Sequence, residues 1–153
     1  MSLEKEIKQT RPFSSKKEKA IVNIIYTNNW IFLNYSKNLK KYDISNQQYN
    51  VLRILNGQNG KPITINEIIE RMLDKMSNAS RLVDKLLAKG LVSREQRQGN
   101  RRACDVILTE KGKLFLEEVK TDMNLNEDKM SPLTDEEFDT LNELLDKMRK
   151  KVQ

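Results

Sequence analysis

The chain has 153 residues, with 28 basic and 22 acidic side chains, no histidine, and a net charge of +6. Five glycines and three prolines beside 33% charged residues favour a mostly helical protein of one-domain length over a β-sandwich or barrel. Without histidine and with one cysteine, Cys104, the chain cannot build a dedicated zinc site. Its glycines form no phosphate-binding fingerprint, and no spacing of Ser, Asp or Lys indicates a catalytic set. We therefore expect no enzyme, metal or cofactor.

The sequence gives no sign of a membrane or an export signal. No apolar run approaches the length of a membrane span, and the polar first ten residues lack the apolar core of a signal peptide. One cysteine cannot form an internal disulfide, in agreement with a reducing compartment. We expect a cytoplasmic protein with no membrane partner.

The first long helix is predicted over residues 15–41, where Ser15 and Glu18 have the spacing of a capping box. Its apolar residues cover a wide arc, and such a helix usually has two partners to bury it. Its own domain and a second subunit are the two candidates. The two apolar lines are Ile21, Ile24, Ile25, Ile31, Phe32, Tyr35 and Leu39, and Val22, Tyr26, Trp30 and Leu33.

A helix-turn-helix is predicted next. Ser45 and Gln48 form a second capping box, and Thr64 and Glu67 form a third, which opens a short helix. After a turn over residues 74–76, Ser77 is expected to cap the following helix, which ends at Gly90. Two short helices joined by such a turn define the motif. The inner face of the second helix holds Ala79, Leu82, Val83 and Leu86.

The periodicity then changes to that of strands. Residues 91–96 and 103–108 are predicted as two strands with the hairpin dipeptide Gly99-Asn100 between them, which completes a winged helix over residues 45–109. Thr109 and Thr134 are expected to cap two further helices. The last one has an apolar seam suited to packing on another helix. The seam residues are Phe138, Leu141, Leu145, Met148 and Val152.

The predicted fold class is mainly α with a small β-hairpin wing, in a single domain over residues 1–153. The winged helix-turn-helix is flanked by dimerisation helices in residues 15–41 and 110–153.

The segment from Lys75 to Arg102 carries the whole net charge, because it holds eight basic and two acidic residues. Such a concentration is typical of a surface that binds phosphate, and the second helix of a helix-turn-helix enters the major groove. A solvated helix face and a solubilising loop are the alternatives, and base and phosphate contacts are not distinguished. The candidate DNA-binding residues are Ser77, Asn78, Ser80, Arg81 and Lys85 on the helix, and Arg97, Arg101 and Arg102 on the wing.

The chain resembles the MarR family of transcriptional regulators. The resemblance rests on Arg81-Leu82-Val83-Asp84-Lys85-Leu86, Lys89-Gly90-Leu91-Val92, Asn100-Arg101-Arg102 and the segment Val106-Ile107-Leu108-Thr109-Glu110-Lys111-Gly112. Arg102 falls on the family's wing arginine, whereas Asn100 replaces its aspartate. The resemblance implies a homodimeric repressor that binds a pseudo-palindromic operator in double-stranded DNA.

The same resemblance implies release from DNA by a small phenolic or aromatic effector. Tyr26, Trp30 and Tyr49 are the candidate ligand-binding residues, although aromatic side chains at helical spacing are more often packing contacts. Cys104 is expected to act as a small hydrophobic residue. A winged helix used only for protein–protein contact, and a small-molecule-binding protein without an operator, are the alternative functions.

Overall fold

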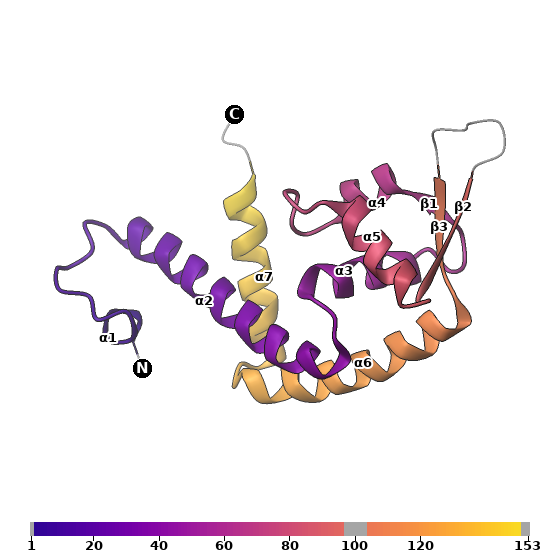
Figure 1. The fold of residues 1–153 in the computed structure, drawn as a ribbon. Coiled ribbons are helices and arrows are strands. Elements are labelled where there is room, and N and C mark those ends of the chain that lie inside the picture. The colour runs from indigo at the N-terminus through magenta and orange to yellow at the C-terminus, as the bar shows by residue number, and fades with distance from the viewer. Residues whose placement is uncertain (1, 97–103, 151–153) are drawn as a thin grey trace. The chain divides into compact units, whose positions relative to one another are not determined.

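The computed structural model describes residues 2–96 and 104–150, apart from the side chains of residues 128–130. The chain divides into two compact units, residues 1–119 and 120–153. Helices dominate, and the first unit also holds a three-stranded antiparallel sheet (Figure 1). The predicted fold class, mainly α with a β-hairpin, is confirmed. That residues 1–153 form a single domain stays a prediction.

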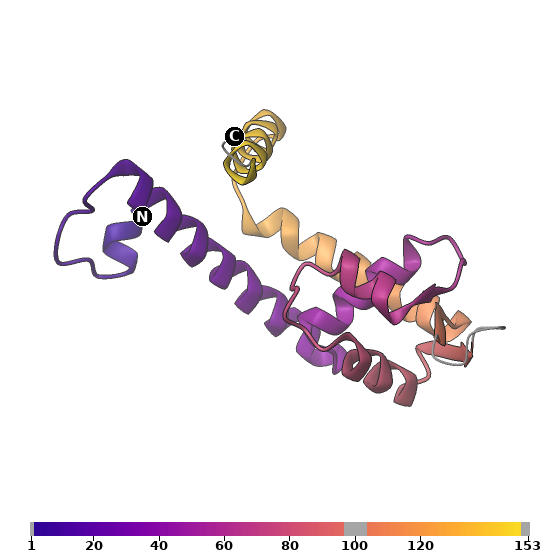
Figure 2. The same ribbon diagram turned by 90° about the horizontal axis from the view of Figure 1, so that it is seen from above.

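The N-terminal part consists of a short helix α1 (Leu3–Glu6) and the long helix α2 (Lys16–Leu39), which Figure 2 shows as one continuous rod. Ser15 caps α2 as predicted, since its hydroxyl oxygen accepts a hydrogen bond from the Glu18 backbone N–H at 3.0 Å. The return bond of the predicted capping box is replaced, because the Glu18 carboxylate accepts from the Ser14 N–H at 2.6 Å. A 3-10 turn η1 (Lys40–Tyr42) follows, and Asp43 then adopts a left-handed conformation with φ of 52°. The chain thereby turns from α2 into the winged helix.

The winged helix contains α3 (Asn46–Asn56), β1 (Ile63–Thr64), α4 (Ile65–Arg71), α5 (Ala79–Ala88), β2 (Val92–Gln96) and β3 (Cys104–Leu108). The capping boxes of Ser45 with Gln48 and of Thr64 with Glu67 are both present. The predicted cap of α5 is wrong. Asn78, not Ser77, holds that position, and its side-chain oxygen accepts from the Arg81 N–H at 3.0 Å.

The sheet has the order β1-β3-β2. Strands β2 and β3 are the predicted hairpin, in register with Val92 opposite Leu108 and Gln96 opposite Cys104. Strand β1 was not predicted from sequence. It is only two residues long, and it is defined by its pairing with β3, where Ile63 lies opposite Val106.

The core of the first unit lies among α3, α4, α5, the sheet and the first half of α6 (Glu110–Met130). Its fully buried side chains include Val51, Leu52, Ile68, Val83, Leu86, Leu91, Val106, Leu116 and Val119. The burial of these apolar side chains is the main contribution to the stability of the folded unit. Helix α6 is capped by Thr109, whose hydroxyl accepts from the Gly112 N–H at 2.9 Å and donates to the Gly90 carbonyl at 2.7 Å.

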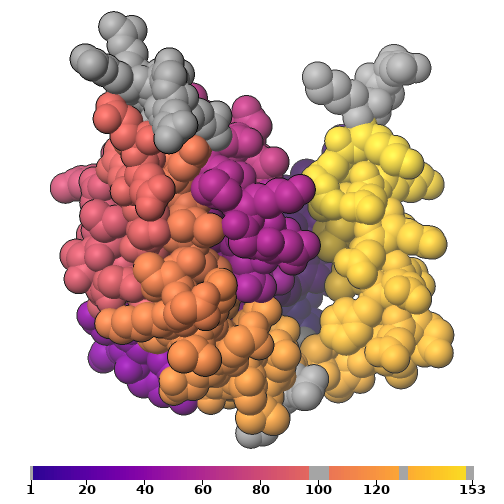
Figure 3. Space-filling model, turned by 90° about the vertical axis from the view of Figure 1, so that its right-hand side faces the viewer, coloured from indigo at the N-terminus to yellow at the C-terminus, as the bar shows by residue number. Residues whose placement is uncertain are grey.

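Thr134 caps helix α7 (Asp135–Arg149) as predicted, and it forms a capping box with Glu137. None of its residues is buried in the described structure, and Figure 3 shows its side chains (yellow) on the surface. Within the described ranges, no helix is both long and apolar enough to span a membrane.

Candidate nucleic-acid interface

The outward face of α5 presents two free cations. Ser80, Arg81 and Lys85 are exposed on this helix, opposite the buried side chains of Ala79, Val83 and Leu86. Among the residues that the structure describes, the side chains of Arg81 and Lys85 form no hydrogen bond or ion pair. They are therefore available to a ligand, and a polyanion is the ligand that two unpaired cations on one helix face attract.

Asn78 and Ser77 have structural roles at the start of α5. The side-chain oxygen of Asn78 is engaged by the helix cap, which leaves its amide N–H groups as the donors for a ligand. The Ser77 hydroxyl donates to the Asp74 carboxylate at 2.7 Å, and the Met76 N–H donates to the same carboxylate at 2.9 Å. These hydrogen bonds, with that of Ser77 the stronger cause, lower the pKa of Asp74. Together they fix the turn that leads into the helix.

Three other cations of the segment from Lys75 to Arg102 form hydrogen bonds or ion pairs within the chain, namely Lys75, Lys89 and Arg94. Lys75 donates from Nζ to the Glu70 carbonyl oxygen at 2.5 Å, at the C-terminal end of α4. Arg94 on β2 pairs with Asp84 on α5, with 3.1 Å between Nη1 and Oδ1.

Lys89, at the end of α5, pairs with Asp43. The hydrogen bond and charge of Lys89 lower the pKa of that carboxyl group. Sequence reasoning missed both ion pairs, because their partners are 10 and 46 residues apart and follow no local spacing rule. The segment's charge is thus partly structural and partly free.

The predicted wing residues Arg97, Arg101 and Arg102, together with Asn100, lie outside the described residues. The strands on either side of them are described as far as the pair formed by Gln96 and Cys104. Cys104 itself is half-buried on β3.

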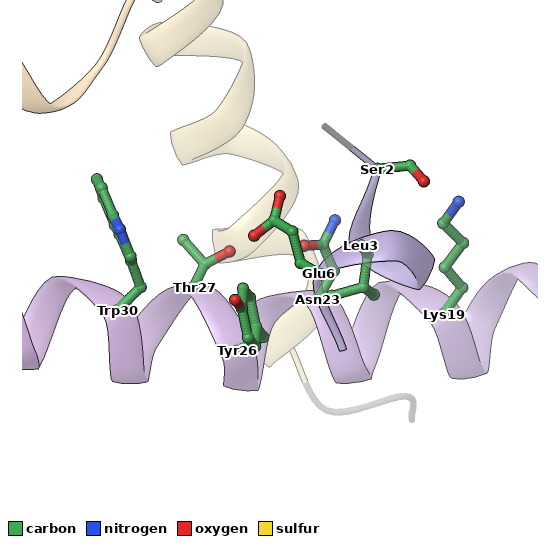
Figure 4. Close-up of a pocket in the computed structure, with 8 residues that line it drawn as sticks. All are labelled: Ser2, Leu3, Glu6, Lys19, Asn23, Tyr26, Thr27 and Trp30. Carbon is green, nitrogen blue, oxygen red and sulfur yellow. The ribbon is translucent and has the colours of Figure 1, made fainter. Parts of the chain in front are cut away.

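Two of the three predicted ligand-binding residues lie together. Tyr26 and Trp30 line a hollow of about 500 Å³ between α1 and α2, which Figure 4 shows in close-up. Partial removal from water, and then the Glu6 carboxylate, raise the pKa of Tyr26. Tyr49 does not line this hollow. It is buried on α3, with the Arg53 guanidinium 5.8 Å from its ring centre. The remaining lining residues are Ser2, Leu3, Glu6, Lys19, Asn23 and Thr27.

The helix-turn-helix, the paired strands behind it and the basic outer face of α5 define a winged-helix protein of the nucleic-acid-binding kind. Residues 42–103 match the family model described as the MarR family. This match and the relatives below support a regulator of the MarR family.

The proteins similar to this chain include a curated relative and two solved structures. The transcriptional repressor MprA of Escherichia coli K12 is 33% identical over 86 residues, which cover 56% of this chain and 49% of the relative. The chain therefore matches about half the length of that curated relative.

A MarR-like transcription regulator from Bacillus cereus ATCC 10987 has 25% identity and a TM-score of 0.76, over 90% of this chain and 98% of the other. A mutant MarR from E. coli complexed with operator DNA has 24% identity and a TM-score of 0.72, over 98% and 100%. The likeness to the E. coli MarR mutant shows a shared fold.

Proposed function

We propose that this protein is a sequence-specific DNA-binding transcription regulator of the cytoplasm. The observation that carries the proposal is the free pair of cations, Arg81 and Lys85, on the exposed face of α5. In a helix-turn-helix this helix enters the major groove, where arginine can bind guanine edges and lysine can bind phosphate. The likeness of the fold to a MarR structure complexed with operator DNA supports the proposal.

We infer that the regulator acts as a homodimer. Helix α2 exposes 55% of Ile25 and 63% of Leu33, and α7 exposes 59% of Leu144 and 52% of Met148. Large apolar side chains grouped on one helix mark an interaction surface. Two chains of +6 carry +12, and two-fold symmetry presents two copies of α5 to successive major grooves of a pseudo-palindrome. We also infer repression, because the curated relative is a repressor.

The test is selection of bound sequences from random duplex DNA by the purified full chain. A regulator of this kind enriches a pseudo-palindrome with half-sites about 10 bp apart, and its affinity falls steeply with salt. No enriched sequence and no salt-dependent binding to duplex DNA would overturn the proposal. That result would favour a winged helix that contacts only proteins.

A small aromatic effector is the second part of the proposal, and the hollow beside Tyr26 and Trp30 supports it. Pockets of this size, with aromatic walls and a few polar groups, accommodate small ligands. Trp30 is the only tryptophan in the sequence and is 42% exposed, so its fluorescence reports on this hollow alone.

Titration with phenol should quench Trp30 fluorescence and weaken DNA binding, whereas cyclohexanol, the matched non-aromatic control, should do neither. Quenching that leaves DNA affinity unchanged would favour a small-molecule-binding protein. The absence of quenching would remove the effector site.

A further inference from the structure

The ion pair between Asp84 and Arg94 connects α5, which would contact DNA, to β2, the strand that precedes the predicted wing. Asp84 lies on α5 between the free cations Arg81 and Lys85, and 57% of its side chain is exposed. Arg94 comes from β2, the strand that leads to the wing, and 33% of its side chain is exposed. The pair therefore lies at the surface that α5 presents, where it joins helix to strand.

The register of the sheet places Arg94 on the core side of β2. Side chains alternate along a strand, so Arg94 shares a face with Val92, which is buried, and it lies opposite the buried Val106. Its guanidinium reaches Asp84, with 3.1 Å between Nη1 and Oδ1. Two residues later, at Gln96, the described part of β2 ends. The pair thus joins α5 to β2 close to the point where the described part of the strand ends.

We propose that Asp84 and Arg94 form a positioning pair that determines sequence specificity. The inference rests on the proposed function. Attraction to phosphate is independent of sequence, whereas base contacts require a side chain held in register with the base edges. Asp84 keeps Arg94 from binding phosphate indiscriminately, and the pair holds α5 and β2 in one geometry. Both effects raise the preference for the operator over other DNA.

Two single substitutions test the pair because they change the charge in opposite directions. Asp84→Asn adds one positive charge per subunit, and Arg94→Gln removes one. If the two residues acted only through charge, each variant would shift affinity for all DNA together, and the ratio of non-operator to operator Kd would stay constant.

For a positioning pair, that ratio falls in both variants. We expect the ratio of non-operator to operator Kd to fall about threefold per subunit, or about tenfold for a dimer. The interaction between the two residues of an exposed ion pair changes an equilibrium constant by at most about fivefold, which sets this scale.

The matched control is Glu95→Gln, which adds the same charge as Asp84→Asn from the neighbouring position on the opposite face of β2. This variant should keep the wild-type ratio. The charge-swapped double variant D84R/R94D should recover most of the lost specificity, since it rebuilds the pair in reverse.

The readout is the affinity for the selected operator and for a scrambled duplex, with circular dichroism melts to check that each variant folds. An unchanged ratio in both single variants would overturn the inference. Failure of the wild-type chain to select any sequence would instead overturn the proposed function, so the two failures are distinct.

Discussion

Helices α5 and α7 are both amphipathic, but their apolar side chains have opposite environments. On α5, Ala79, Val83 and Leu86 are at most 1% exposed, because α3, α4 and the sheet cover them. On α7, Leu141 is 41% exposed and Met148 is 52% exposed. The winged helix therefore completes a core of its own, whereas α7 has an apolar face that needs another surface. Periodicity along a helix identifies the apolar face and leaves its partner to be found.

The largest effect is expected where the winged helix is most tightly packed. Gly112 lies in the first turn of α6, and a Cβ at this position would be 1.9 Å from the Leu91 carbonyl oxygen. That oxygen is held by a hydrogen bond from the Thr109 N–H at 3.2 Å, so it cannot easily move. Gly112→Ala should lower the free energy of unfolding by about 3 kcal/mol, as overpacking against backbone does.

Urea unfolding followed by circular dichroism measures this loss. The matched control is Gly57→Ala, where a Cβ would meet its nearest atom at 3.5 Å and the backbone is already helical. It should leave stability unchanged or raise it by about 0.5 kcal/mol. Equal stability of the two variants would show that Gly112 and Leu91 do not approach as closely as the structure has them.

The second effect concerns the exposed face of α7. Removing the chain from Thr134 onward should convert a dimer into a monomer, because the apolar seam of this helix would then be lost. Leu141→Glu should do the same while keeping the helix, and Asn142→Glu serves as the control on the next residue. Light scattering of the purified proteins gives the mass. A truncated chain that remains a stable dimer would assign the interface to other helices.

The third effect concerns the free cations of the recognition helix. Arg81→Ala should weaken operator binding about tenfold without unfolding the protein, since a base or phosphate contact of arginine contributes about 1–3 kcal/mol. Arg102→Ala on the predicted wing should have a similar effect. Lys37→Ala removes the same charge from an exposed position on α2 and should change affinity little. Fluorescence anisotropy with the selected operator measures the affinity of each variant. Unchanged affinity in both arginine variants would show that Arg81 and Arg102 do not belong to the DNA interface.

Much of the fold followed from local spacing in the sequence. The boxes of Ser45 with Gln48 and of Thr64 with Glu67 mark helix starts because both partners lie within one turn. Ser77 and Asn78 show the limit of this reasoning. Both residues are good helix caps, and the choice was decided by Asp74, which binds the Ser77 hydroxyl and leaves Asn78 to cap α5. Strand β1 was missed because its existence depends on pairing with β3, about 40 residues away in sequence.

The candidate site was predictable to a similar degree. Arg81 and Lys85 follow from charge and helical periodicity, since both stand opposite the apolar face of α5. Which cations are engaged within the chain did not follow, because Asp84 and Arg94 come together only in the folded chain. The grouping of Tyr26 with Trp30 rests on helical spacing alone, whereas Tyr49 belongs to a different helix and is buried there.

The smallest effect is expected at the ion pair between Asp43 and Lys89, which ties the residues after α2 to the end of α5. Asp43 has a left-handed backbone that asparagine also tolerates, so Asp43→Asn removes the charge without straining the chain. The urea midpoint should fall slightly at neutral pH, because exposed ion pairs contribute little.

The pH dependence of this difference fixes its cause. The Lys89 hydrogen bond and charge lower the pKa of the Asp43 carboxyl group below its ordinary 3.8. A carboxyl group with a lowered pKa in the folded state stabilises the protein fully above its unfolded pKa, and this contribution disappears as the pH falls through the folded pKa.

The midpoint difference between wild type and Asp43→Asn should therefore be constant from neutral pH to about pH 5 and vanish in stronger acid. In a Lys89→Gln background the same substitution should have no effect at any pH. A difference that persists there would mean that Asp43 acts through the turn and not through its charge, and that the end of α2 is held to α5 by packing alone.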